Sequence, residues 1–90
     1  MTEEEIRRGY LEELVKVAPD IAPEDVGADD HLQDDLALDS MDVLNFVAAL
    51  HERFGVDVPE REYPQIATLS VAIGYLGQRI GVAGRGGGMT

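Results

Sequence analysis

The sequence predicts an all-α fold: a small bundle of three main helices, with a short extra helical turn and a long loop between the first two helices. Apolar residues recur at spacings of three and four in three separate segments, which is the pattern of amphipathic helices. Clusters of proline, glycine and aspartate separate these segments and break the periodicity. The 90 residues suffice for one domain with a thin core, which disfavours a deep catalytic cleft.

The first helix is expected to begin at Thr2, which forms a capping-box pattern with Glu5, and to end at Pro19. Gly9 is expected beside the apolar stripe and not within it. The stripe consists of Ile6, Tyr10, Leu11, Leu14, Val15 and Ala18.

Residues 19–38 carry no periodicity and are predicted to form the long loop. Connections of this length in small domains are usually packed against the core or functional. Their acidic cluster lacks the central glycine and closing glutamate of an EF-hand, so no metal site is predicted. The residues expected to pin the loop to the core are Ile21, Val26, Leu32 and Leu36.

The second helix is expected to begin at Asp39 or Ser40 and to run to about Phe54, with Gly55 at its C-cap. Replacement of Phe54 by alanine is expected to cost about 3–5 kcal/mol, on the view that this ring is buried. The inner stripe is predicted to be Phe46, Val47, Leu50 and Phe54. The adjacent face carries Met41, Leu44 and Ala48.

In the last third of the sequence, the pattern predicts a short extended stretch from Val56 and one helical turn over Pro59–Tyr63, which Pro64 interrupts. Thr68 can then cap a final helix that ends at Ile80. Its apolar face consists of Leu69, Ala72, Ile73, Leu76 and Ile80, while Gly74 and Gly77 weaken it.

The domain is therefore predicted to span residues 1–80, and residues 81–90 are expected to form a flexible glycine-rich tail.

Composition excludes several classes of protein. The net charge of −11 opposes binding to nucleic acid or anionic membranes and favours basic protein partners, although acidity can also serve solubility alone. No apolar stretch is long enough for membrane insertion, and no signal peptide is apparent. The chain has no cysteine, which excludes a disulfide scaffold and a cysteine nucleophile and fits a cytoplasmic location. Any thiol chemistry must come from a cofactor.

Ser40 is the candidate functional residue, and two interpretations of it are open. A serine at a helix start normally caps the helix through its hydroxyl. Alternatively, a hydroxyl exposed at the end of a long loop is a point of covalent attachment. A phosphodiester there would face free amides at the positive end of the helix dipole.

The stretch around Ser40 resembles the acyl carrier protein family. Leu36 and Asp39-Ser40-Met41-Asp42 fall where that family has Leu-Gly-x-Asp-Ser-Leu, and the resemblance covers about residues 3–80. The supporting positions further along are Leu44, Val47, Leu50, Phe54, Val58, Pro59, Tyr63, Ile66, Thr68, Ala72, Tyr75 and Leu76.

The resemblance implies a non-catalytic carrier. A separate phosphopantetheinyl transferase would attach 4′-phosphopantetheine to the Ser40 hydroxyl, and the thiol of the arm would hold acyl groups as thioesters, which a bundle core could shelter. Asp39 would meet the transferase. The chain would act as a monomeric, cytoplasmic partner of acyl-activating and acyl-transferring enzymes. The residues expected to contact these enzymes are Asp39, Met41, Asp42 and Leu44, with Ala48 at the edge.

Some positions depart from the family pattern. Ala37 replaces the usual glycine and restricts the loop, and Met41 replaces the usual leucine. Asn45, His51 and Arg53 stand on the second helix where carriers of fatty-acid synthesis are often acidic. These changes indicate a different partner set in a dedicated pathway, or neutral drift of a solvated face.

Several functions remain open at this point. The cargo could belong to fatty-acid, lipid or specialised metabolism. A peptidyl, aminoacyl or polyketide carrier is a close alternative, and an unmodified acidic interaction module is a rival of another class. An enzyme is the least supported, because His31 and His51 are interpreted as surface or loop residues and no Gly-x-Ser-x-Gly elbow is present.

Overall fold

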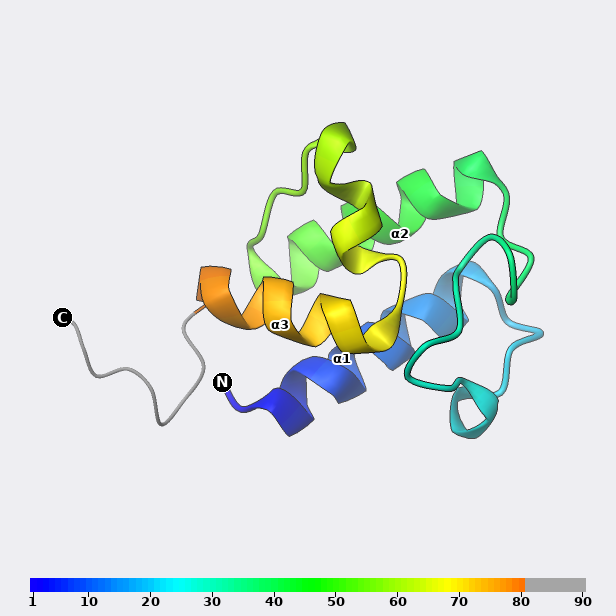
Figure 1. Cartoon of the computed structure of the whole chain (residues 1–90), viewed down its shortest axis with the longest axis horizontal. Helices are drawn as coiled ribbons and strands as arrows, with labels where there is room; N and C mark the ends of the chain where they lie inside the picture. Colours follow the sequence, from blue (N-terminus) through cyan, green and yellow to red (C-terminus); the bar gives the residue numbers. More distant parts are fainter. Residues whose placement is uncertain (81–90) are drawn as a thin grey trace, which may run out of the picture.

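The computed structural model describes residues 1–80, and the predicted tail at 81–90 lies outside the described residues. Three α-helices carry the fold: α1 (Glu3–Val17), α2 (Ser40–Phe54) and α3 (Leu69–Ile80). Two 3₁₀ segments accompany them, η1 (Pro23–Asp25) in the long loop and η2 (Glu60–Ile66) before α3. Figure 1 shows α1 packed along both α2 and α3, with η2 lying over α3. The predicted all-helical fold is confirmed.

Local chemistry sets the helix ends. Thr2 and Glu5 form the predicted capping box, with the Glu5 amide donating to Thr2 Oγ1 at 3.2 Å and the Thr2 amide donating to Glu5 Oε1 at 2.8 Å. Gly55 ends α2 in the left-handed region at φ 71°, which glycine adopts without a Cβ penalty. Thr68 Oγ1 accepts a long hydrogen bond of 3.4 Å from the Val71 amide at the start of α3.

Two of the predicted segments differ in detail. Pro64 does not interrupt η2, which continues to Ile66, because the φ that the proline ring imposes also suits a 3₁₀ turn. The loop contains η1, which the sequence interpretation missed, although Pro23 at its first turn is a recognised signal. Backbone bonds from Leu32 to the Ala67 carbonyl (3.0 Å) and from Ser70 to the Ala28 carbonyl (2.9 Å) hold this loop against the η2–α3 junction.

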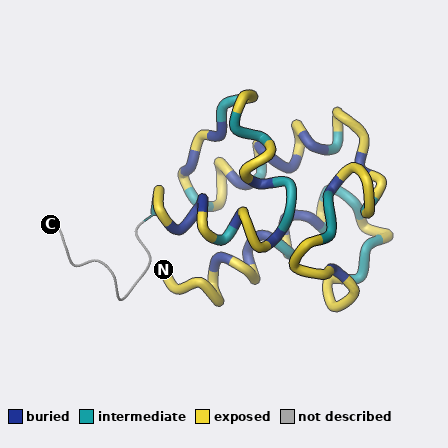
Figure 2. Tube along the Cα trace, viewed as in Figure 1, coloured by how far each residue is buried: buried dark blue, intermediate teal, exposed yellow. Residues whose placement is uncertain are grey.

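The core lies where the inner faces of α1, α2 and α3 meet, as Figure 2 shows in dark blue. The rings of Tyr10 and Phe46 meet edge to face at its centre, 4.8 Å apart. The predicted stripe on α2 was wrong at two positions, because Val43 is buried while Phe54 is only partly buried. The large stability cost therefore belongs to Phe46, which is fully enclosed.

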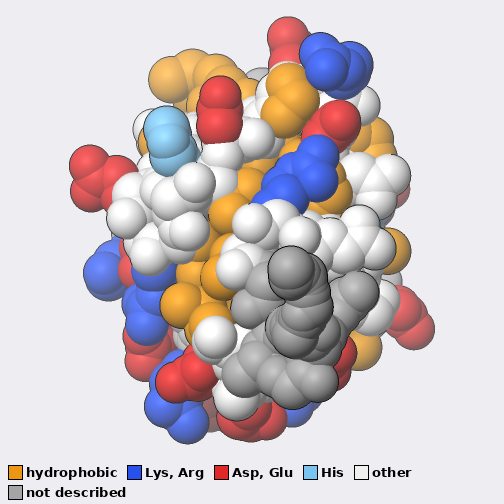
Figure 3. All heavy atoms as spheres, turned by 90° about the vertical axis from the view of Figure 1, so that its left-hand side faces the viewer, with side chains coloured by type: hydrophobic (Ala, Val, Ile, Leu, Met, Phe, Trp, Pro, Cys, Tyr) orange, Lys and Arg blue, Asp and Glu red, His pale blue; other side chains and the backbone are white. Residues whose placement is uncertain are grey.

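Gly9 was also placed wrongly, since it is buried in the contact between α1 and α2. A Cβ built on Gly9 would come within 2.5 Å of the Phe54 ring and 2.7 Å of Arg53 Nε. The absent side chain lets the two helices approach closely. On one face of the molecule, Figure 3 shows hydrophobic side chains in a band between intermingled acidic and basic ones.

Candidate functional site

Ser40 occupies the first helical position of α2 and is exposed. It is not the cap, because Asp39 Oδ1 accepts the Asp42 amide at 2.8 Å and Asp42 Oδ2 accepts the Asp39 amide at 3.3 Å. This capping box satisfies the helix end without the serine. Among residues 1–80, no hydrogen bond engages the Ser40 hydroxyl. The interpretation of Ser40 as a plain cap is therefore wrong, and its oxygen is free for chemistry.

The capping box also modifies the expected environment of a phosphodiester. The Asp42 amide is already used by Asp39, so the amides of Ser40 and Met41 are those still open at this helix end. The carboxylates of Asp39 and Asp42 flank these amides and repel a further anion. The dipole remains favourable, and the exposed setting screens the like charges.

The chain reaches Ser40 through a constrained turn. Ala37 has a φ of 62°, in the left-handed region that L-residues rarely adopt. The next residue is anchored, since Leu38 is buried and its amide donates to the Leu32 carbonyl at 2.9 Å. This turn points the following Asp39-Ser40 pair outward. The family's glycine at position 37 would adopt the same conformation without strain.

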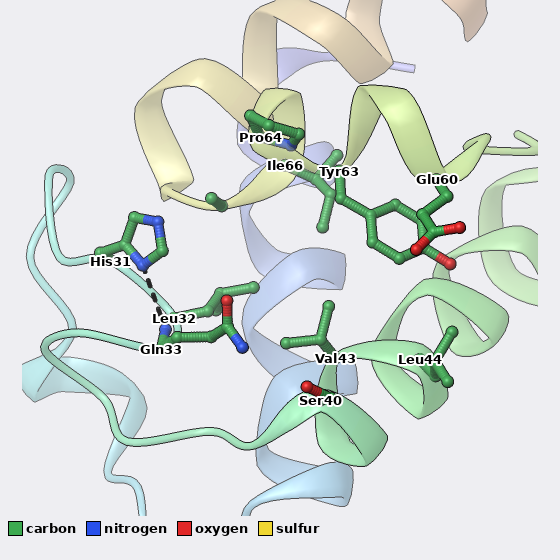
Figure 4. A pocket seen from close by; sticks show the side chains of 11 residues that line it. His31, Leu32, Gln33, Ser40, Val43, Leu44, Glu60, Tyr63, Pro64 and Ile66 are labelled. Carbon is green, nitrogen blue, oxygen red and sulfur yellow. Dashed lines mark hydrogen bonds between the residues drawn. The ribbon is translucent and has the colours of Figure 1, made fainter.

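A cavity of about 300 Å³ opens beside Ser40. Its walls come from the long loop, the first turns of α2, and η2, as the close-up in Figure 4 shows. Leu32, Val43 and Ile66 are its buried apolar lining. Its polar lining consists of His31, Gln33, Ser40, Glu60 and Tyr63. The sequence interpretation missed this grouping, because residues from the loop and from η2 meet only in the folded chain.

Hydrogen bonds from α1 and α3 hold the η2 wall of the cavity in place. The buried Tyr10 hydroxyl donates to the Ile66 carbonyl at 2.9 Å. Glu62 accepts hydrogen bonds from the Tyr75 hydroxyl and from Arg79, whose guanidinium lies 4.1 Å above the Tyr75 ring. The hydrogen bond from Tyr75, followed by that from Arg79, holds the pKa of Glu62 below its ordinary value. These contacts fix η2 to α1 and α3.

The residues predicted to contact partner enzymes lie together on the outer face of α2 and at its start. Met41 and Leu44 are large apolar side chains with exposed fractions of 63% and 46%. Asp39 and Ala48 are exposed and Asp42 is half-buried. This surface therefore combines an exposed apolar pair with two carboxylates.

The two histidines lie at different places relative to this site. His51 is exposed near the end of α2. His31 lines the cavity, where its Nδ1 accepts the Gln33 and Asp34 amides at 3.2 and 3.3 Å. Residues 1–80 contain no cluster of side chains suited to a metal ion. None of the helices in residues 1–80 is long and apolar enough to cross a membrane.

Known proteins resemble this helical bundle in both sequence and structure. The family model described as a phosphopantetheine attachment site matches residues 9–76. The acyl carrier protein of Renibacterium salmoninarum is 37% identical over 73 residues, which cover 81% of this chain and 89% of that protein. That of Campylobacter hominis is 33% identical over 73 residues, which cover 81% and 86%.

The solved structure of an acyl carrier protein from Enterococcus faecalis agrees, with a TM-score of 0.66 at 28% identity over 84% of this chain and 95% of that one. The chain belongs to the acyl carrier protein family, whose members are phosphopantetheine-dependent carriers and not catalysts.

Proposed function

We propose that Ser40 is the residue that receives 4′-phosphopantetheine and that the chain then carries acyl groups as thioesters on this arm. The proposal rests on one observation: the Ser40 hydroxyl is exposed, is free of the cap, and borders a cavity. When bound, the arm supplies the thiol that a chain without cysteine lacks. The adjacent cavity supports a role as a shelter for part of the acyl group.

The attachment step would be performed by a phosphopantetheinyl transferase. A new P–O bond forms to Ser40 Oγ as the pyrophosphate bond of coenzyme A breaks. The hydroxyl proton passes to a base of the transferase, and adenosine 3′,5′-bisphosphate leaves. The substrate side chain needs exposure and freedom from internal hydrogen bonds, both of which Ser40 has. No activating base beside Ser40 is required in this chain.

The experiment combines the apo protein, coenzyme A and a promiscuous phosphopantetheinyl transferase, and reads the intact mass. One phosphopantetheine adduct is expected. It should be lost in Ser40→Ala and kept in Ser70→Ala, which removes the only other serine hydroxyl of the chain. A folded protein that gains no adduct would instead be an unmodified interaction module.

Asp39 is proposed to contact the transferase in addition to capping α2. Asp39→Asn separates these roles, because asparagine caps helices as well as aspartate does but carries no charge. Slower modification at an unchanged Tm supports the contact. Equal rates would leave Asp39 with the capping role alone.

The partner surface is proposed to be Asp39, Met41, Asp42, Leu44 and Ala48, and the partners to be enzymes that load or transfer acyl groups. Exposed apolar side chains supply contact area, and the carboxylates attract basic surfaces. The cytoplasmic, monomeric state expected from the sequence stays a prediction. Mass spectrometry of the protein isolated from its own cell would identify the pathway through the bound acyl group.

A further inference from the structure

The exposed side of α2 carries almost no charge, although the whole chain has a net charge of −11. Residues 43–51, which form most of α2, contain no lysine, arginine, aspartate or glutamate. Among residues 1–80, four large apolar side chains are exposed, and two of them, Met41 and Leu44, lie one turn apart on this helix. Since solubility favours charged surfaces, it does not explain an exposed helix side that is uncharged and partly apolar.

Three positions of α2 depart from the acidic family pattern, and the structure separates them. The exposed side of α2, which we call the outer face, consists of Met41, Leu44, Asn45, Ala48 and His51, which the helical repeat places together. Asn45 and His51 bring no negative charge to this face. Arg53 instead lies toward α1, where its guanidinium pairs with Glu12 and Glu13 at 2.8 and 2.9 Å. Arg53 therefore supports the α1–α2 contact, while the two other changes alter the surface that a partner meets.

The carboxylates of α2 are confined to its two ends. Asp39 and Asp42 lie at its start, beside Ser40, and Glu52 lies in its last turn. Between these ends, a lysine or arginine of a partner would lose water without gaining a carboxylate of α2, which is unfavourable. An apolar partner surface would instead gain from covering Met41, whose side chain adapts to the shape that it contacts.

We propose, on the basis of the carrier function above, that enzymes acting on this carrier dock on the outer face through an apolar, uncharged surface and place cations only beside Asp39 and Asp42. Met41 and Leu44 are the main contacts. Figure 4 shows Leu44 one turn along α2 from Ser40, so an enzyme docked there reaches the attachment point of the arm. The partner class is therefore an acyl-handling enzyme with an apolar docking groove.

The same face excludes a second class of enzyme. An enzyme with an extended basic docking surface needs carboxylates along α2, and Asn45 and His51 leave its cations unpaired. The two residues are thus specificity determinants, because they act against the wrong partner and contribute little to the right one.

The first experiment tests the apolar contact with the apo full chain, coenzyme A and the promiscuous phosphopantetheinyl transferase, at about 25 mM and about 300 mM salt. Leu44→Asn should raise the KM for the carrier about tenfold at both salt concentrations and leave kcat unchanged, because salt does not screen an apolar contact. Val71→Asn is the matched control, since Val71 on α3 is 44% exposed and Leu44 is 46% exposed. It should leave the KM unchanged.

The second experiment tests the exclusion with the holo full chain and an acyl carrier synthetase of fatty-acid metabolism whose docking surface is basic. Asn45→Glu combined with His51→Glu should raise kcat/KM for acyl loading about tenfold at low salt, and high salt should remove this gain. Gln65→Glu combined with Gln78→Glu adds the same charge at exposed positions of η2 and α3. This control should change kcat/KM less than about twofold.

The two proposals fail in different ways. If Leu44→Asn is modified with the KM of the wild type, or if the Asn45→Glu/His51→Glu variant gains no more than its control, the docking proposal is overturned and the carrier function stands. A wild-type chain that gains no phosphopantetheine adduct overturns the carrier function, and the docking proposal with it.

Discussion

The two long sides of α2 are built differently. Toward α1 the helix is sealed by the Tyr10–Phe46 contact and by close packing at Gly9, and Arg53 bridges to Glu12 and Glu13 at 2.8 and 2.9 Å. Toward η2, the two segments enclose a cavity, and no hydrogen bond joins them in the described residues. Stability is therefore concentrated on one side of the helix, which leaves the side next to Ser40 open for a ligand.

The largest expected effect tests the sealed side. Phe46→Ala should lower the free energy of unfolding by about 3–5 kcal/mol, because it removes a fully enclosed ring from the core. Leu44→Ala on the open side should cost less than about 1 kcal/mol, since Leu44 is 46% exposed. Urea unfolding measures both. Equal losses of unfolding free energy in the two variants would mean that both sides of α2 contribute equally to stability.

The next comparison uses two tyrosines, Tyr10, which donates a hydrogen bond to η2, and Tyr63, which lies within η2. Tyr10→Phe should cost about 1–3 kcal/mol, because the buried Ile66 carbonyl loses its donor. Tyr63→Phe should change stability by less than about 0.5 kcal/mol, since the Tyr63 hydroxyl has no partner in the described residues. A Tyr63→Phe loss as large as that of Tyr10→Phe would show that the Tyr63 hydroxyl also contributes to the stability of the fold.

Two glycines test whether close packing is confined to the contact between α1 and α2. Gly9→Ala should destabilise the fold by about 1–2 kcal/mol, because the new methyl group meets the Phe54 ring and Arg53. Gly74→Ala should stabilise it by about 0.5–1 kcal/mol, because α3 has open space there and alanine is the better helix former. Thermal unfolding should show Tm shifts of opposite sign, and shifts of the same sign would refute the close contact at Gly9.

A smaller effect is expected in the turn before Ser40. Ala37→Gly should raise stability by about 0.5–1 kcal/mol, because glycine relieves the strain at φ 62° while losing more entropy on folding. The rate of modification by the transferase should not fall. An unchanged or lower Tm would show that the left-handed turn carries little strain.

The smallest effect concerns the support of η2. The lowered pKa of Glu62 means that its contribution to stability is present above its ordinary value of 4.5 and is lost as pH falls below it. The Tm difference between the wild type and Glu62→Gln should therefore shrink between about pH 6 and pH 3. A difference independent of pH would exclude the ionised form of Glu62 as the stabilising group.

Much of the fold was predictable because it depends on neighbours in sequence. The capping box of Thr2, the left-handed Gly55 and the start of α2 after Asp39 all follow from bonds within a few residues. The resemblance around Ser40 was likewise a local pattern, and the family comparisons confirm the class of protein. The role of Ser40 itself stays a prediction until the mass is measured.

The sequence alone determined where the helices begin and end, how long the first loop is, and which serine stands at a helix mouth, because each depends on backbone bonds and propensities within one segment. Only the tertiary structure decided that Gly9 and Val43 are buried while Phe54 is only partly buried, because α1 and α2 each share their apolar faces among neighbours whose position no single segment specifies. It also brought Gln33 and Tyr63 to one cavity, since residues thirty positions apart meet only when the loop is tied to η2.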